Sequence, residues 1–367
     1  MSEGERRAAL PRRTRVVVGV IVALLCFAAV LRVSGNARGI NAFDQLWVGA
    51  RALVAGDDPY ALVGPGRALS QKAPNFYPAT AMVAVLPLAP LRLEIARATF
   101  FALSAGVLAF ALTARGFGAL GAIGSGSFAL ALLSQQWSPI LTATLLLPGL
   151  SWLYAVKPNV GAALFAARPT WRGAAAAAIG GAVLAGVAFA FRPHWFGEWI
   201  AMTRQAPHVR SLVMHPAGPL LLLALTRWRR PEARLVAAFA LVPHSTLFYE
   251  ALPLLVLVPR TRQQLLALLL LNWIGTLVEA WLVFLPGFEW RSNVYVVGEL
   301  MLAFAYLPAL IVVLRRPNVA PDDAPLPAWA ERAARAMSRL GDRVGLRRPG
   351  AAVASAWKLA TAPLAAK

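Results

Sequence analysis

The chain has little cysteine and none of the motifs that mark soluble enzymes. Cys26 is the only cysteine among 367 residues, so the sequence offers no disulfide framework and no cysteine-based metal site. It contains no phosphate-binding P-loop, dinucleotide-binding glycine pattern, GxSxG elbow or HExxH zinc motif. Its four histidines lack the spacing of a metal site: His194, His208, His215 and His244. The sequence therefore predicts no metal and no cofactor.

Acidic residues are also scarce, and charged residues as a whole are few. The chain has 16 Asp and Glu against 36 Lys and Arg, yet 59% of its residues are hydrophobic and only 14% are charged. This composition is typical of a polytopic membrane protein. The basic residues lie mainly between apolar runs and in the C-terminal tail, as they do in cytoplasmic loops. We therefore expect a membrane, and no nucleic acid, as the partner of this basic chain.

The apolar runs predict an all-α polytopic membrane protein with about ten membrane segments. The first run, residues 16–31, follows five arginines and precedes no signal-peptide cleavage site, which predicts an uncleaved span and a cytoplasmic N-terminus. Further spans are expected at residues 93–114, 118–133, 173–191, 265–285 and 294–314. Residues 1–316 form the predicted membrane domain. Residues 317–367 form a predicted basic amphipathic tail, so both termini are expected in the cytoplasm.

Several shorter apolar runs are broken by proline. Residues 76–91 contain Pro87 and Pro90 and predict a re-entrant or interfacial segment. Residues 140–167 predict a helical hairpin that turns near Pro148-Gly149 and returns Lys157 to the outer side. Shorter spans are expected at residues 235–242 and 252–258, and an outer loop at residues 192–215.

The loop after the first span, residues 41–60, holds three of the 16 acidic residues: Asp44, Asp57 and Asp58. Apolar residues recur there at helical spacing, which predicts a short amphipathic helix in the outer interface that ends before Pro59. Carboxylates are costly near a bilayer and usually have a function there. Asp44 either caps this helix or serves chemistry, whereas Asp57 and Asp58 are also good turn formers.

The predicted topology gathers polar residues on the outer side of the membrane, opposite the arginine-rich inner loops. They are Asp44, Arg51, Asp57, Asp58, Tyr77, Gln135, Gln136, Lys157, Asn159, His194, His208, His215, His244, Tyr249 and Glu250. This gathering predicts a polar cavity that faces outward.

Two adjacent segments resemble a known family. DQLWVGARALVAGDDPY, followed by NFYPATAMVAVLPLAPL, resembles the signature of the bacterial polyprenyl-phosphate-mannose-dependent mannosyltransferases of the GT-C superfamily. QQWSPIL, AVKPNV and VPHSTLFYEALPLLV extend the resemblance more weakly, to residues 42–258 in all. It implies a GT-C-like bundle in the bacterial plasma membrane. The implied enzyme transfers a hexose, mannose in this family, from a polyprenyl-phosphate-sugar donor to a lipid or glycan acceptor on the outer face.

The resemblance also implies roles for particular residues. Asp44 matches the family's catalytic aspartate in the first outer loop, and Asp58 matches its Asp-Pro-Tyr element. Tyr77 stands in the family's Tyr-Pro-Pro, which reads Tyr77-Pro78-Ala79 here. The family's Gly-Gln reads Gln135-Gln136, and the hairpin that follows is shorter than in the family.

The expected chemistry is direct displacement with inversion at the anomeric carbon. Asp44 would accept the proton of the attacking hydroxyl, and a cation would stabilise the departing lipid phosphate. Lys157 is the first candidate for that phosphate contact, followed by Arg51 and His244. Each assignment has a structural alternative: Lys157 as a residue that extends to the interface, and His244 as a buried residue with its hydrogen bonds satisfied.

Two other functions fit the composition. A lipid or sugar transporter or flippase would show internal repeats and charged residues within its spans, and no repeat period is evident. A catalytically degenerate scaffold of the same fold would show departures such as those at Gln135 and in the compressed hairpin.

Overall fold

The computed structural model describes residues 10–34, 42–70, 74–205, 209–245, 247–284, 290–320, 328 and 331–332. The chain divides into two units, Met1–Pro321 and Asp322–Lys367, and every element named below belongs to the first. The amphipathic tail helix expected around residues 329–344 lies almost entirely outside the described residues. The tail therefore stays a prediction.

Five helices in the described part of the chain are long and apolar enough to cross a membrane. They are α1 (Arg12–Ser34), α4 (Leu93–Leu112), α8 (Trp171–Phe191), α12 (Arg262–Phe284), and the continuous α13 (Trp290–Met301) and α14 (Leu307–Leu314), which are joined by the π-helical segment Leu302–Tyr306. The expected all-α class is confirmed at this level, and five long helices, not ten, have the length of a span. The other apolar runs form shorter pieces.

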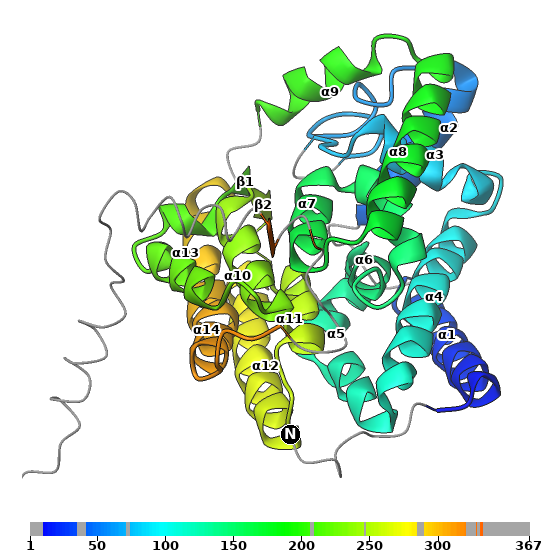
Figure 1. Ribbon diagram of the computed structural model, residues 1–367. Coiled ribbons are helices and arrows are strands. Elements are labelled where there is room, and N and C mark those ends of the chain that lie inside the picture. Colours follow the sequence, from blue (N-terminus) through cyan, green and yellow to red (C-terminus); the bar gives the residue numbers. More distant parts are fainter. Residues whose placement is uncertain are drawn as a thin grey trace, which may run out of the picture. The chain divides into compact units, whose positions relative to one another are not determined.

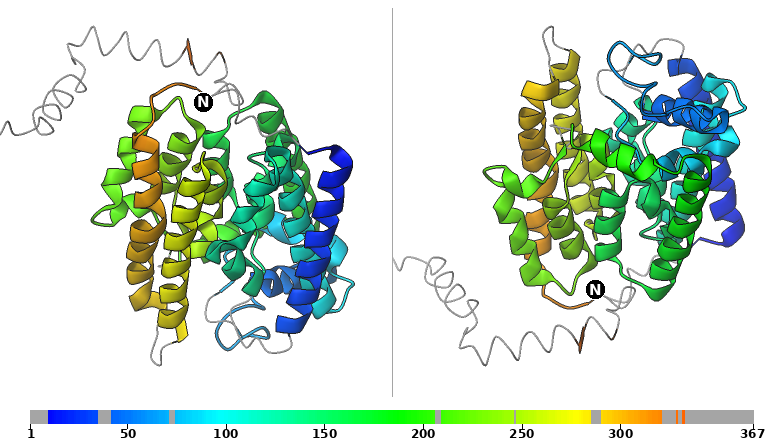
Figure 2. Two further views of the ribbon diagram at one scale, coloured as in Figure 1. Left: turned by 90° about the horizontal axis from the view of Figure 1, so that it is seen from below. Right: turned by 90° about the horizontal axis from the view of Figure 1, so that it is seen from above.

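The five long helices differ in how much of their surface the rest of the protein covers. Only 11% of the apolar window of α8 and 17% of that of α1 are buried, against 67% for α4. Since their uncovered side chains are apolar, α1 and α8 present surfaces suited to lipid, while α4 is a central helix. Figure 2 shows α1 on one side of the first unit and the α12–α14 group on the other.

Helices α1 and α4 lie side by side along much of their length (Figure 1). Small residues permit this close approach: a Cβ at Gly106 would lie 2.8 Å from the carbonyl oxygen of Gly19 and 2.9 Å from the Cβ of Ala23. Such small-residue seams are common between membrane helices. Arg15 closes one end of the seam, with its guanidinium 4.1 Å from the ring centroid of Phe110.

Short helices fill the space between the long ones. They are α2 (Ala42–Ala55), α3 (Ala79–Ala84), α5 (Gly126–Leu133), α6 (Ser138–Ala143), α7 (Pro158–Ala167), α10 (Pro231–Leu241) and α11 (Leu252–Leu257), with 3₁₀ segments at Leu86–Leu88, Thr113–Arg115, Phe117–Gly124, Pro148–Val156, Leu212–Met214, Gly218–Arg227 and Phe248–Ala251. Proline opens several of them, because its fixed φ and missing N–H suit the first turn.

The proline breaks expected at Pro148 and around Lys157 are therefore confirmed. The single span expected over residues 118–133 is wrong. It divides at Ser125, whose Oγ accepts a hydrogen bond from the backbone N–H of Phe128 (3.1 Å) and so caps α5.

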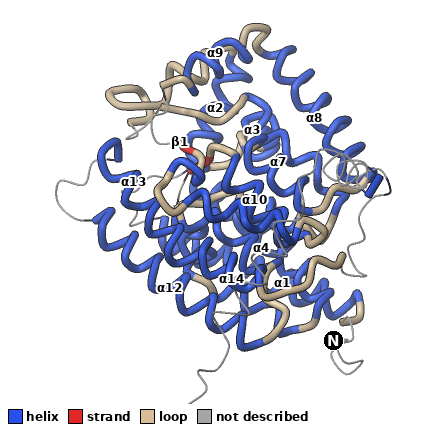
Figure 3. The backbone as a smooth tube through the Cα atoms, turned by 60° about the vertical axis from the view of Figure 1, so that its left-hand side comes forward, coloured by secondary structure: helices blue, strands red, loops and turns tan. Residues whose placement is uncertain are grey.

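One end of the first unit holds the elements that follow the first span. Helices α2 and α3 lie there beside α9 (Trp195–Thr203), which begins just after α8 ends (Figures 1 and 3). The helix predicted from the spacing of Phe43, Leu46 and Leu53 is confirmed as α2, which buries these residues and leaves Val54 63% exposed. The strands β1 (Val209–Arg210) and β2 (His244–Ser245) form a two-residue antiparallel pair nearby.

A buried group of ion pairs joins the ends of three helices of the first unit. Glu232, at the start of α10 and 0% exposed, lies 2.8 Å from Nε of Arg230, 2.6 Å from Nη1 of Arg316 and 3.7 Å from Nη2 of Arg260. Arg316 follows α14, and Arg260 precedes α12. We call these four residues the Glu232 clamp.

Candidate functional site

The candidate site is built around Lys157, which stands between the 3₁₀ segment Pro148–Val156 and α7. Its Nζ forms an ion pair with Oε1 of Glu250, in the 3₁₀ segment before α11, and the two side chains are 11% and 2% exposed. Burial lowers the pKa of Lys157, but the charge and hydrogen bond of Glu250, together with Tyr249 and Tyr77, outweigh it and hold this pKa above the ordinary lysine value. The lysine is therefore a fixed cation, as buried charges are tolerated only when paired.

Three more residues of the predicted outer polar set surround this pair. Nζ of Lys157 lies 5.3 Å from the ring centroid of Tyr249. Tyr77 experiences the charges of both Lys157 and Glu250, and its hydroxyl donates to Oε1 of Gln136 (3.2 Å). We call Tyr77, Gln136, Lys157, His244, Tyr249 and Glu250 the Lys157 cluster. Its Tyr77–Gln136 and Lys157–Glu250 contacts join residues that are 59 and 93 apart in sequence.

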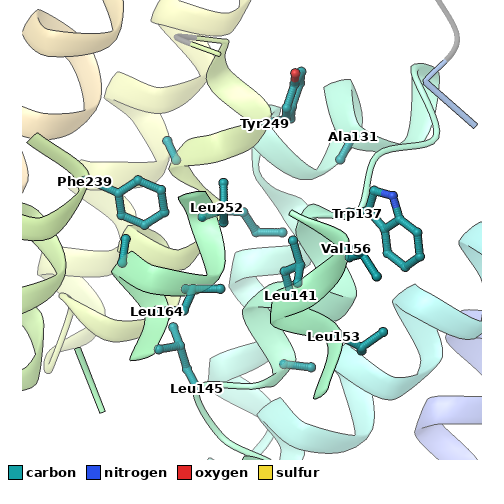
Figure 4. Close-up of a cluster of buried hydrophobic side chains, with 14 of the residues drawn as sticks. Ala131, Trp137, Leu141, Leu145, Leu153, Val156, Leu164, Phe239, Tyr249 and Leu252 are labelled. Atoms are coloured by element: carbon teal, nitrogen blue, oxygen red, sulfur yellow. The ribbon is translucent and has the colours of Figure 1, made fainter. Parts of the chain in front are cut away.

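Tyr249 of this polar group also borders a cluster of buried apolar side chains (Figure 4). Leu141, Val156, Leu164, Phe239 and Leu252 come from five different elements and are nearly or fully buried. Tyr249 lies at the margin of the cluster with its hydroxyl directed away from it. The apolar packing therefore fixes the backbone of the short pieces that present the polar side chains.

His244, the first residue of β2, belongs to the Lys157 cluster because the charges of Glu250 and Lys157 both act on its imidazole. Strand β1 pairs with it at Arg210, and the imidazole is fully buried. Its Nδ1 lies 3.0 Å from the carbonyl oxygen of Ser245, while Nε2 has no hydrogen-bond partner. Burial lowers the pKa of His244 below the ordinary value, and Glu250 opposes this only partly. The imidazole is therefore neutral at neutral pH.

Buried polar residues of α5 and α12 hold the turn that carries Glu250. The backbone N–H of Phe248 donates to Oε2 of Glu279 (2.9 Å), and the carbonyl oxygen of Phe248 accepts from Oγ of Ser127 (2.5 Å). Asn272 donates to that same Oγ at 2.7 Å and accepts from the backbone N–H of Ser127 at 2.9 Å. Glu279 and Asn272 therefore position Glu250 without belonging to the cluster themselves.

Asp44 lies in a separate buried ion pair. Its Oδ1 and Oδ2 accept from Nε and Nη2 of Arg97 in α4, at 2.6 and 2.5 Å, and its residue surface is 5% exposed. Burial raises the pKa of Asp44 above the ordinary aspartate value, and the Arg97 guanidinium opposes this rise. A two-pronged contact of this kind fixes a carboxylate in position and orientation. The first turn of α2 thus presents a carboxylate that Arg97 holds in place.

An aromatic row runs from the Asp44 pair toward the Lys157 cluster. The Phe43 ring stacks on Phe100 with centroids 4.8 Å apart, and Phe100 meets Trp137 edge-on at 4.8 Å. Nδ2 of Asn75 donates to the carbonyl oxygen of Gln45, while its Oδ1 accepts from the backbone N–H of Tyr77. The two ends of the row, Phe43 and Trp137, are the sequence neighbours of Asp44 and of Gln136.

The remaining predicted site residues make their contacts elsewhere. Arg51 is exposed, packs over Trp47 at 4.7 Å and donates to the carbonyl oxygen of Ala89. Asp58 accepts from the backbone N–H of Tyr60 (2.8 Å) in the turn after α2 and lies 3.7 Å from Arg192. Their roles in substrate binding stay predictions.

Gln135 holds its own turn. Its φ is 43°, and its Nε2 donates to the carbonyl oxygens of Leu132 and Leu133, at 2.7 and 3.1 Å. Its predicted role in substrate binding stays a prediction. Among the described residues, no group of three or more His, Cys, Asp or Glu side chains could hold a metal ion.

None of three comparisons finds a match. The chain was compared with models of known protein families, with curated proteins and with solved structures. The resemblance to the mannosyltransferases therefore rests on the quoted segments, and the enzymatic function stays a prediction.

Sequence reasoning missed Arg97 and Glu279. Glu279 lies buried within α12, and Arg97 lies within α4. Both residues are ionisable and lie inside a predicted span, where an ionisable residue needs a partner. The sequence shows both ionisable residues. It does not show that Arg97 pairs with Asp44 or that Glu279 accepts from the backbone N–H of Phe248.

Proposed function

We propose that the chain is a membrane glycosyltransferase that moves a hexose, here mannose, from a polyprenyl-phosphate-sugar donor to a lipid or glycan acceptor. The observation that carries this proposal is convergence. Tyr77, Gln136, Lys157 and Glu250 come from four different segments that resemble the mannosyltransferases, and they meet around one buried cation. Chance similarity of short segments gives no reason for such a meeting.

In this proposal each charged group has a separate task. Lys157 stabilises the lipid phosphate as the bond between its oxygen and the anomeric carbon breaks. The acceptor hydroxyl attacks that carbon from the opposite side, and its proton passes to the Asp44 carboxylate, which inverts the configuration. Arg97 positions this carboxylate and opposes the effect of its burial on its pKa.

The proposal also supplies the setting. The five long helices and the shorter pieces form a GT-C-like bundle of about ten membrane segments in a bacterial plasma membrane. Both termini lie in the cytoplasm, and Asp44 and the Lys157 cluster face outward. The lipid-suited surfaces of α1 and α8 allow a polyprenyl chain to remain in the bilayer while its head group reacts.

The test is sugar transfer in membranes from radiolabelled polyprenyl-phosphate-mannose, comparing wild type with Asp44→Asn. Asparagine keeps the shape and one acceptor for Arg97, so it removes mainly the base. We expect a loss of transfer of about 10²-fold or more at equal expression. The matched control is Asp57→Asn, an exposed carboxylate of the same loop, which should keep transfer near wild type.

Two results would count against the proposal. If Asp44→Asn labels the acceptor as well as wild type does, Asp44 is not the base. If wild-type membranes leave the donor intact under all conditions, the glycosyltransferase assignment fails and a non-catalytic scaffold of this fold gains support.

A transporter or flippase for lipid-linked sugars is the second candidate, because Glu279 is a buried carboxyl group within a long apolar helix. Charged groups at such positions often mark substrate or ion paths. Proteoliposomes that contain fluorescent polyprenyl-phosphate-sugar separate the two functions. A flippase moves the lipid between leaflets and leaves its sugar attached, whereas a transferase consumes the donor.

A further inference from the structure

His244 of the Lys157 cluster and its neighbour Tyr306 each have a polar atom without a hydrogen-bond partner: Nε2 of His244 and the hydroxyl oxygen of Tyr306. Both side chains are fully buried, and their ring centroids are 6.4 Å apart. The charge of Glu250 acts on both of them. Buried polar atoms are usually paired in native proteins, so two unpaired atoms next to each other and next to a buried ion pair mark a place where a ligand's polar group could be bound.

The backbone around Tyr306 is arranged in an unusual way. Tyr306 ends the π-helical segment Leu302–Tyr306, which interrupts an otherwise α-helical span. Such segments change the helix register, are costly to form and occur frequently at functional sites. Phe239 packs against both rings: its ring centroid lies 5.2 Å from that of His244 and 6.2 Å from that of Tyr306. This packing restricts the orientation of both rings.

The chemistry of the two atoms indicates the kind of group that they bind. A phenol hydroxyl can donate or accept a hydrogen bond, and each nitrogen of a neutral imidazole does one or the other. A single hydroxyl group of a ligand can donate to one of these two atoms and accept from the other. Neither carries the charge that a phosphate requires, and Lys157 already supplies that charge nearby. The matching partner is a neutral hydroxyl group.

We propose that Nε2 of His244 and the hydroxyl of Tyr306 together bind one hydroxyl group of the donor's sugar ring. This inference rests on the proposed function and extends it: Lys157 contacts the phosphate, and the His244–Tyr306 pair recognises the sugar. It also moves His244 from the phosphate contact, where the sequence placed it, to the sugar.

The experiment measures equilibrium binding of radiolabelled farnesyl-phosphate-mannose to the full chain in lipid nanodiscs, and so requires no acceptor and no turnover. Analogues that lack one ring hydroxyl each are measured in parallel. The variants are Tyr306→Phe, which removes only the hydroxyl, and His244→Asn, whose amide can still donate to the carbonyl oxygen of Ser245. Thr276→Val is the matched control, because it also removes a buried hydroxyl without a hydrogen-bond partner, but one that belongs to α12.

We expect Tyr306→Phe to weaken binding of the complete donor by about 3- to 10-fold, the effect of one neutral hydrogen bond, and Thr276→Val to leave it unchanged. One deoxy analogue should bind wild type and Tyr306→Phe equally, since the paired group is already absent. His244→Asn should lose affinity for the complete donor and not for that same analogue. It serves as the second test should Tyr306→Phe fail to fold.

Two other outcomes contradict the inference in distinguishable ways. If wild type binds the donor and both variants bind every analogue as wild type does, the two atoms pair only with water and the inference fails, while the proposed function stands. If wild type binds no farnesyl-phosphate-mannose, the proposed function fails and the sugar contact fails with it.

Discussion

Lys157 and Glu250 compensate each other's charge in a place that water scarcely reaches. Replacing Lys157 with Met leaves the Glu250 carboxylate buried without a partner, which should destabilise the protein by about 3–5 kcal/mol. The double variant Lys157→Met, Glu250→Gln removes both charges and should regain most of that stability. Unfolding in mixed micelles by increasing sodium dodecyl sulfate measures both changes.

The double variant also separates folding from function at this residue pair. It should fold and yet bind no polyprenyl-phosphate-sugar, because the cation for the phosphate is gone. Donor binding by a stable double variant would show that the pair is purely structural.

Residue types in the site could be predicted from the sequence, while their pairing could not. Tyr77, Gln136, Lys157, His244 and Glu250 all belong to the polar set that topology assigns to one side. However, the Lys157–Glu250 pair joins residues 93 apart, and the Asp44–Arg97 pair joins residues 53 apart. No local periodicity relates such positions, so only the packing of the short pieces reveals which charges meet.

At the scale of elements, α12 determines the position of the turn that carries Glu250. Glu279→Leu removes the acceptor of the Phe248 backbone N–H and leaves that buried donor unpaired, which should cost about 1–3 kcal/mol. Glu279→Gln keeps an oxygen at the same place and should stay close to wild type in stability and in donor binding. Micelle unfolding and the nanodisc binding assay measure the two quantities.

Thr276→Val is the matched control on the same helix. Its Oγ1 is buried and has no hydrogen-bond partner, so the nearly isosteric valine should be neutral or slightly stabilising. Equal losses for Glu279→Gln and Glu279→Leu would instead indicate that the charge of Glu279, and not its hydrogen bond, is what matters.

Long elements were easier to predict than short ones. Continuous apolar runs of about 20 residues predicted α4, α8 and α12 well, since length and hydropathy suffice for a span. The run at residues 118–133 failed, because a Ser125 cap divides it and composition does not register a cap. Proline marked the breaks at Pro148 and before α7, where its missing N–H has a direct backbone effect.

For the whole unit, the Glu232 clamp links pH to stability. Burial alone raises the pKa of Glu232, but hydrogen bonding to Arg230 and the neighbouring arginine charges lower it below the ordinary glutamate value of about 4.5. The ionised Glu232 therefore stabilises the folded protein fully above a pH of about 4.5, and this stabilisation is lost as the pH falls through the lowered pKa of Glu232. Glu232→Gln should be about 3–5 kcal/mol less stable than wild type at neutral pH, and this difference should shrink on acidification.

Unfolding of both proteins across the acidic range checks this prediction. The matched control is Glu198→Gln, which breaks the half-exposed pair with Arg192 and should cost at most about 1 kcal/mol. The prediction is contradicted if the difference in unfolding free energy between wild type and Glu232→Gln stays constant down to the lowest pH.

The shortness of the inner helices has a consequence for biosynthesis. Helix α7 has 10 residues and α11 has 6, so they extend about 15 Å and 9 Å, far less than the hydrocarbon thickness of about 30 Å. A translocation channel that releases segments to lipid one by one has no reason to release these alone. They must wait beside the channel until a later long helix, such as α8 or α12, arrives to cover them. We therefore expect the residues of the Lys157 cluster to meet late in biosynthesis, after the long helices that cover the short ones are in place.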